Sequence, residues 1–139
     1  MRMLLDTNVL SEVRRVKPDL GVLRWLDELD EDRTFVSVIS LAEIRRGIAL
    51  MDEGRRKTEL AAWLAHDLPQ RFAGRVLSVN TDVALAWGDL MGHARKKGVG
   101  LASLDAFIAA TAHAHGLVLA TRNINDFQGF GLDLLNPWD

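Results

Sequence analysis

Short apolar runs alternate along the chain with longer segments whose apolar residues recur at helical spacing. The apolar runs predict strands over 3–5, 34–38, 75–79 and 117–120, with a short fifth over 132–135. The periodic segments predict helices over 7–14, 18–30, 40–51, 55–72, 81–97 and 103–115. Strands separated by helices pair in parallel and are covered on both faces. The alternation therefore predicts an α/β fold of three layers, α/β/α, with a short central parallel sheet and a helical hairpin at about 40–72.

The length and the residue types restrict the kind of protein further. With 139 residues the chain has material for one core, so we expect a single domain over 1–139. It has no cysteine, which excludes disulfides and thiolate metal sites and leaves oxygen or histidine as metal ligands. No signal peptide is recognisable, and no apolar run approaches the roughly 20 residues of a membrane helix. We therefore expect a cytoplasmic protein without a membrane partner.

Carboxylates recur where the predicted strands end or the predicted helices begin. Asp6 follows the first strand directly, and Glu43 comes within five residues of the strand at 34–38. Asp105 lies in the first turn of a helix, and Asp126 follows shortly after the strand at 117–120. In open α/β sheets the carboxyl ends of the strands lie on one edge, where ligands bind. We therefore expect the four acids to lie close together.

Helix capping is the structural explanation that competes with a site. Asp6 suits an N-cap, Ser40 and Glu43 have the spacing of a capping box, and Ser103 can cap the helix that carries Asp105. Asp126 can stabilise a turn. Taken singly, capping is the better explanation for Glu43 and Asp126, and it is as good as a site for Asp6 and Asp105. However, Ser and Thr cap as well as Asp does, so capping does not explain why acids recur along one edge.

A divalent cation would explain the repeated acids. Carboxylates that converge in a partly buried cleft raise one another's pKa values, and a bound cation removes that cost. Oxygen ligands without cysteine or histidine suit Mg²⁺ or Mn²⁺, which retain waters and accept phosphate oxygens. The chemistry this predicts is attack of a metal-activated water on a phosphodiester bond.

The polar residues beside the acids are predicted accessories. Thr7 and Asn8 can orient Asp6, Ser40 can contact Asp6 or Glu43, and Thr121 can hold a water of the metal. Turn chemistry explains each of these residues equally well.

Four stretches spread across essentially the whole chain belong together: "LLDTNVLSE", "VSVISLAEIRRGI", "LDAFIAATAHAHGLVLATRNINDF" and "NPW". In this order they resemble the PIN-domain ribonucleases of the VapC/FitB toxin type. The resemblance implies a PIN-like fold and an endoribonuclease that depends on Mg²⁺, with Mn²⁺ as a substitute. It also implies the toxin of a type II toxin–antitoxin pair, inhibited by a cognate VapB-like antitoxin and built on a homodimer.

The resemblance also assigns roles by position. It makes Asp6 and Asp105 the direct metal ligands, with Glu43 and Asp126 completing the catalytic acids through water. Asn123 stands where some members of the family carry Asp. Either Asp126 is the fourth acid and Asn123 a polar accessory, or three acids are sufficient.

The helical hairpin at 40–72 is the predicted partner surface. Its apolar stripes predict a groove for an antitoxin helix or for a second copy of the chain. Arg45, Arg46 and Arg122 are candidate contacts to RNA phosphates or to an acidic partner, although basic residues on helices usually lie on a solvated face.

Two other functions are compatible with acids at strand ends. One is a non-catalytic module that binds a metal or partner in an acidic pocket, as receiver domains do, but these carry paired acids near the N-terminus and a late lysine. Here Asp6 stands alone and the late cation is Arg122. The other is a DNA-directed nuclease with the same metal site.

Overall fold

The computed structural model describes all residues, 1–139, and contains one five-stranded sheet in which every pair of neighbours is parallel. The strands are β1 (Met3–Leu5), β2 (Thr34–Ser37), β3 (Val76–Leu77), β4 (Val118–Ala120) and β5 (Leu134–Leu135). Their order across the sheet is β3-β2-β1-β4-β5. All five predicted strands are present, although β3 and β5 are shorter than the sequence indicates.

Helices follow the strands in the predicted alternation. They are α1 (Thr7–Glu12), α2 (Leu20–Asp27), α3 (Val38–Ala49), α4 (Arg55–Ala62), α5 (Leu68–Arg71), α6 (Thr81–Lys96), α7 (Ser103–His115) and α8 (Ile124–Phe127). A 3₁₀ turn, η1 (Glu31–Arg33), precedes β2, and a π-helical segment, η2 (Trp63–Asp67), connects α4 to α5. None of the helices is both long enough and apolar enough to cross a membrane.

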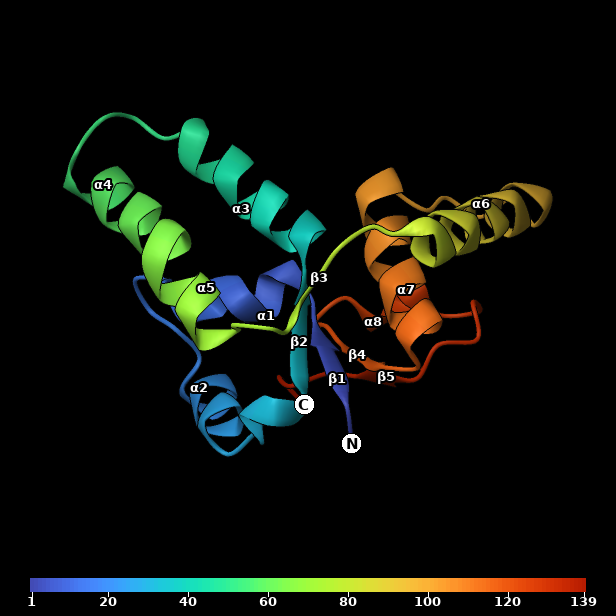
Figure 1. Cartoon of the computed structure of the whole chain (residues 1–139), viewed down its shortest axis with the longest axis horizontal. Helices are drawn as coiled ribbons and strands as arrows, with labels where there is room; N and C mark the ends of the chain where they lie inside the picture. The colour runs from blue at the N-terminus through green and yellow to red at the C-terminus, as the bar shows by residue number, and fades with distance from the viewer.

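The sheet has a separate core on each face, which confirms the three-layer α/β/α prediction. Side chains alternate along a strand. In β1, Met3 and Leu5 pack with residues of α1 to α5, whereas Leu4 packs with α7 and with Phe127 of α8. Figure 1 shows the same division, with α1 to α5 on one side of the sheet and α6 to α8 on the other. The predicted hairpin is α3 followed by α4, η2 and α5 (Figure 1).

One predicted helix start and two predicted helix caps are wrong. The helix predicted from Ser40 begins at Val38, because the Ser37 hydroxyl caps it and accepts the Ile39 N–H at 3.0 Å. Ser40 therefore lies inside α3, and the capping box with Glu43 does not form. The N-cap of α7 is Ala102, which has no side-chain oxygen, so Ser103 does not cap that helix. This leaves Glu43 and Asp105 without the capping arrangements suggested for them.

Candidate active site

The strand order reverses beside β1, the position at which α/β sheets bind ligands. From β1 the chain continues outward through β2 to β3, and it then returns to β4 on the other side of β1 and continues outward to β5. Asp6 follows β1, and Thr121 follows the neighbouring strand β4. The two side chains meet, since the Thr121 hydroxyl donates to Asp6 Oδ2 at 2.7 Å. The first predicted acid thus lies at the point where a site is expected.

Asp6 is buried, with 4% of its surface exposed, and both of its oxygens are hydrogen-bonded. Oδ1 accepts the Thr7 N–H at 2.7 Å, so Asp6 is the N-cap of α1. Oδ2 accepts from Thr121 at 2.7 Å and from Asn8 Nδ2 at 3.4 Å. A cap needs only one oxygen. Capping therefore accounts for Oδ1 of Asp6 but not for the hydrogen bonds that hold Oδ2.

Asp6 interacts electrostatically with each of the other three predicted acids. Burial is the main cause that raises the pKa of Asp6, against hydrogen bonds from Thr121 and Thr7, and the charges of Glu43 and Asp126 raise it further. Burial also raises the pKa of Asp105, followed by the charges of Asp6 and Asp126. The structure thus brings Asp6, Glu43, Asp105 and Asp126 together at one edge of the sheet.

Glu43 is held by Thr7 rather than by its own helix. Thr7 Oγ1 lies 2.8 Å from Glu43 Oε1 and 2.9 Å from Ser40 Oγ. A hydroxyl has one proton and a carboxylate only accepts. Thr7 therefore donates to Glu43 and accepts from Ser40, which is fully buried. Ser40 forms no hydrogen bond with Asp6 or Glu43, and it is connected to Glu43 through the Thr7 hydroxyl.

Thr121 holds Asp6 and has little capacity left for a water. Its proton goes to Asp6, while its oxygen accepts the Asn123 N–H at 3.0 Å and Asn8 Nδ2 at 3.5 Å. The role suggested for Thr121, a contact to a metal-bound water, is therefore replaced by a role in orienting Asp6. Asn8 also accepts the Arg122 N–H at 3.3 Å, which connects α1 to the loop after β4.

The remaining predicted residues lie around this centre. The Asn123 side chain is exposed and does not cap α8, the short helix that carries Asp126. Arg45 and Arg46 are exposed on α3 and form no ion pair. The Arg122 guanidinium lies 5.2 Å from the centroid of the Trp138 ring, in a cation–π contact.

The donor set fits a hydrated magnesium-like ion better than a dry metal cage. No three Asp, Glu or His side chains are grouped tightly enough to hold an ion by themselves. Mg²⁺ usually binds through one or two carboxylates and several waters, so it does not need such a group. Asp6 Oδ1 accepts one hydrogen bond and retains a lone pair for a cation. Asp105 takes part in no side-chain hydrogen bond and is only half-buried.

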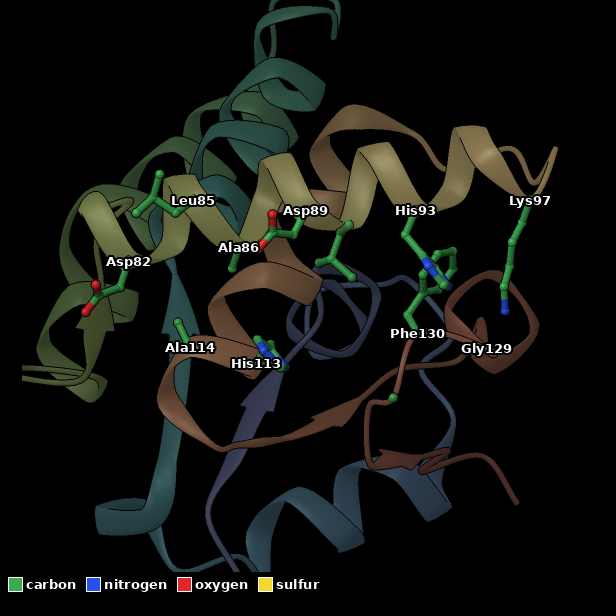
Figure 2. Close-up of a pocket in the computed structure, with 12 residues that line it drawn as sticks. Asp82, Leu85, Ala86, Asp89, His93, Lys97, His113, Ala114, Gly129 and Phe130 are labelled. Atoms are coloured by element: carbon green, nitrogen blue, oxygen red, sulfur yellow. The ribbon is translucent and has the colours of Figure 1, made fainter.

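The largest cavity of the protein lies elsewhere. It has a volume of about 720 Å³ between α6, α7 and the loop at 129–131, and none of the four acids lines it. Figure 2 shows His93 and Asp89 on α6 and His113 on α7 facing this space, with Phe130 beside His93. The volume of a cavity therefore does not identify the candidate site, whereas the grouped carboxylates do.

One buried acid was not predicted. Glu12 is 2% exposed, accepts the Asp19 N–H at 2.7 Å and pairs with Arg15 at 3.2 Å. It joins the end of α1 to the start of α2, and it is not among the groups that raise the pKa of Asp6 or Asp105. Glu12 follows the apolar Val9 by three residues, a helical spacing that could have indicated that it shares the buried face of α1. Glu12 has a structural role.

The raised pKa values predict that metal-free protein loses stability as the pH rises. Folded Asp6 and Asp105 hold protons at a pH where the unfolded chain has released them, so the free energy of unfolding falls from about pH 4 upward through the folded pKa values. Urea unfolding in chelator, from pH 4 to pH 7, should show the Asp105→Asn protein gaining stability over the wild type as the pH rises.

Asp52→Asn is the matched control for this pH effect. Asp52 is exposed in the loop between α3 and α4 and makes no hydrogen bond or ion pair with its side chain. Its substitution should leave the difference from the wild type constant with pH. Identical pH profiles for the wild type and the Asp105→Asn protein would contradict the prediction.

Comparison with known proteins finds similar sequences and structures along nearly the whole chain. The sequence model of the PIN domain matches residues 3–129. The chain is 41% identical to the VapC ribonuclease Y4jK of Sinorhizobium fredii, over 97% of this chain and 96% of that protein. It is 38% identical to the toxin FitB of Neisseria gonorrhoeae, over 97% of each chain. The crystal structure of FitAcB from the same organism superposes with a TM-score of 0.92 at 38% identity, covering 98% of both chains.

Proposed function

The chain belongs to the PIN-domain family, and from this membership we propose that it is a metal-dependent endoribonuclease and the toxin of a VapBC-like toxin–antitoxin pair. The observation that carries the proposal is the buried carboxylate of Asp6, surrounded by three further acids at the reversal of strand order. Its similarity to proteins named ribonucleases supports RNA as the substrate class.

Each acid has a distinct part in the proposed site. Asp6 and Asp105 would contact the cation directly, and Glu43 and Asp126 would act through its waters. Bound Mg²⁺, or Mn²⁺ in its place, supplies a Lewis acid that activates water and neutralises charge on the phosphate. Thr121 and the Thr7 N–H fix the two oxygens of Asp6, and the Thr7 hydroxyl fixes Glu43. These contacts position the carboxylates before substrate binds, so little reorganisation remains for the reaction itself.

Cleavage of RNA but not of DNA is the result that tests the substrate class. The purified protein with Mg²⁺ should cut a single-stranded RNA and leave the DNA strand of the same sequence intact, because RNA-binding proteins distinguish the two by the 2′-hydroxyl. Denaturing gels of labelled strands would measure both reactions. Cleavage of the DNA strand would favour the DNA-directed nuclease, and cleavage of neither would favour the non-catalytic acidic-pocket module.

A groove beside the site is the proposed surface for the antitoxin. It has a volume of about 290 Å³ between α1, α3, α4 and η2, and Thr7 and Glu43 line it together with apolar residues that include Ile44, Ile48 and Trp63. This is the hairpin surface that the sequence predicts. A groove of this kind accepts an amphipathic helix, and one seated here would lie against Glu43.

The charges of the groove indicate what that helix carries. Arg14, Arg15 and Arg56 line it, and Arg14 Nε is buried without a hydrogen-bond acceptor. The groove thus has three cations and one carboxylate, Glu43, so acidic side chains of the partner would offset its positive charge. The proposed antitoxin segment is therefore an amphipathic helix with carboxylates beside its apolar face. The homodimer remains a prediction.

A further inference from the structure

A polar cavity, here called the amide pocket, is lined by one of the four acids, Asp126. It has a volume of about 440 Å³, within the roughly 300–1,000 Å³ typical of ligand sites. Asp126 lines it, so the pocket and the acidic site share a wall. Its other lining residues are Arg122, Asn123, Ile124, Asn125, Gln128, Asn136 and Asp139, of which only Ile124 is hydrophobic. The pocket is thus built from hydrogen-bonding groups and continues the site along the carboxyl ends of β4 and β5.

Three carboxamides in the amide pocket are available to a ligand. Asn123, Asn125 and Gln128 are exposed, and their side chains make no hydrogen bond within the protein. Asn136 differs, because its Oδ1 accepts the Trp138 N–H at 2.9 Å and its Nδ2 donates to the Arg122 carbonyl at 3.5 Å. Asn136 therefore shapes the wall, while the other three offer unused donors and acceptors.

Arg122 supplies the one positive charge among the residues that line the amide pocket. Its guanidinium lies over Trp138, and the indole ring packs against the core on the face of the sheet that α1 to α5 cover. It pairs with no carboxylate, although Asp126 and Asp139 line the same pocket. A cation held in this way beside Asp126 reduces the repulsion that an incoming phosphate chain would meet there.

We propose that the amide pocket binds one base of single-stranded RNA next to the bond that is cut, and so determines which sequence is cleaved. The inference rests on the proposed ribonuclease function. Carboxamides combine a donor and an acceptor in one plane, which is how Asn and Gln pair with base edges. A phosphate at the acids would place the neighbouring nucleotide beside Asp126, at the entrance to the pocket.

The test compares the cleavage sites of variants on a random RNA pool. Asn125→Ala and Gln128→Ala should each weaken the base preference at one position beside the cut by about 5-fold or more. Gln128→Glu should move that preference toward cytosine, because a carboxylate accepts from the N4 amino group. Sequencing the cleaved ends measures the base preference of all three variants. Gln70→Glu, at an exposed position of α5 outside the pocket, is the matched control and should cut as the wild type does.

Several outcomes would overturn the inference. They are an unchanged cleavage profile in both alanine variants, a wild type without any base preference, or complete loss of cleavage in a Gln128→Ala protein that unfolds like the wild type. If one alanine variant does not fold, the other carries the test. The proposed function fails separately, when the wild-type protein cuts no RNA in the pool at all.

Discussion

Replacing Asp105 by Asn should abolish RNA cleavage while leaving the folded protein as stable as the wild type or slightly more stable. The substitution removes one of the two proposed metal ligands. Loss of an outer-shell partner costs metal sites about 10–100-fold in affinity or activity, and loss of a direct ligand should cost more. Stability should not suffer, because Asp105 makes no side-chain hydrogen bond and its charge is repelled by Asp6 and Asp126.

Asp105 tests the site more cleanly than Asp6 does. Asp6→Asn should also abolish cleavage, but Asp6 caps α1 and accepts from Thr121, so its substitution changes structural contacts as well. The measurement pairs the cleavage rate of a labelled RNA with thermal unfolding of the same preparation. Asp52→Asn, which removes an exposed charge, should change neither quantity. A large loss of stability in the Asp105→Asn protein, or retained cleavage, would contradict the assignment.

The sequence predicts where the acids gather because strand ends are easy to locate. Leu4 and Leu5 are apolar and Asp6 is not, so the edge of the sheet is marked in the residues themselves. Parallel pairing then places Asp6 beside the residue that follows β4, as the Thr121 contact confirms. The strand order itself depends on long-range packing, and the local pattern does not contain it.

The contacts of Glu43 show where local reasoning is insufficient. Ser40 and Glu43 have the spacing of a capping box, but Ser37 precedes them and can also cap. Because α3 begins at Val38, Glu43 is on its second turn and reaches Thr7 on another helix instead. Three residues separate the two possible N-caps, Ser37 and Ser40, and tertiary packing decides between them.

The short helix α8 was missed for a related reason. Its four residues, Ile124–Phe127, are too few to show helical periodicity, and Asn123 and Asn125 indicate a turn. The structure fixes the helix through Phe127, which is 1% exposed and packs in the core beside Leu4. That anchor determines where Asp126 lies relative to Asp6 and Asp105, and it places the three carboxamides of the amide pocket.

Removing divalent metal should stop cleavage completely, and adding it back should restore the activity. In excess EDTA the acids of the site lose the cation that offsets their repulsion, and the Lewis acid required for attack on the phosphodiester is absent. Mg²⁺ or Mn²⁺ added beyond the chelator should return the rate of RNA cleavage to its starting value. EDTA saturated with Mg²⁺ beforehand is the control, because it tests for any effect of the chelator itself.

Thermal unfolding provides a second readout of the same metal site. A cation that binds only the folded state raises its stability with concentration, so Mg²⁺ or Mn²⁺ should raise the unfolding temperature of the wild type. The increase should be smaller in the Asp105→Asn protein, which lacks one proposed ligand and begins with less repulsion. Cleavage that persists in excess chelator would exclude a metal-dependent mechanism. Equal increases in unfolding temperature for the two proteins would show that the cation binds elsewhere, because the acids at the end of β1 and the start of α7 would then make no difference to its affinity.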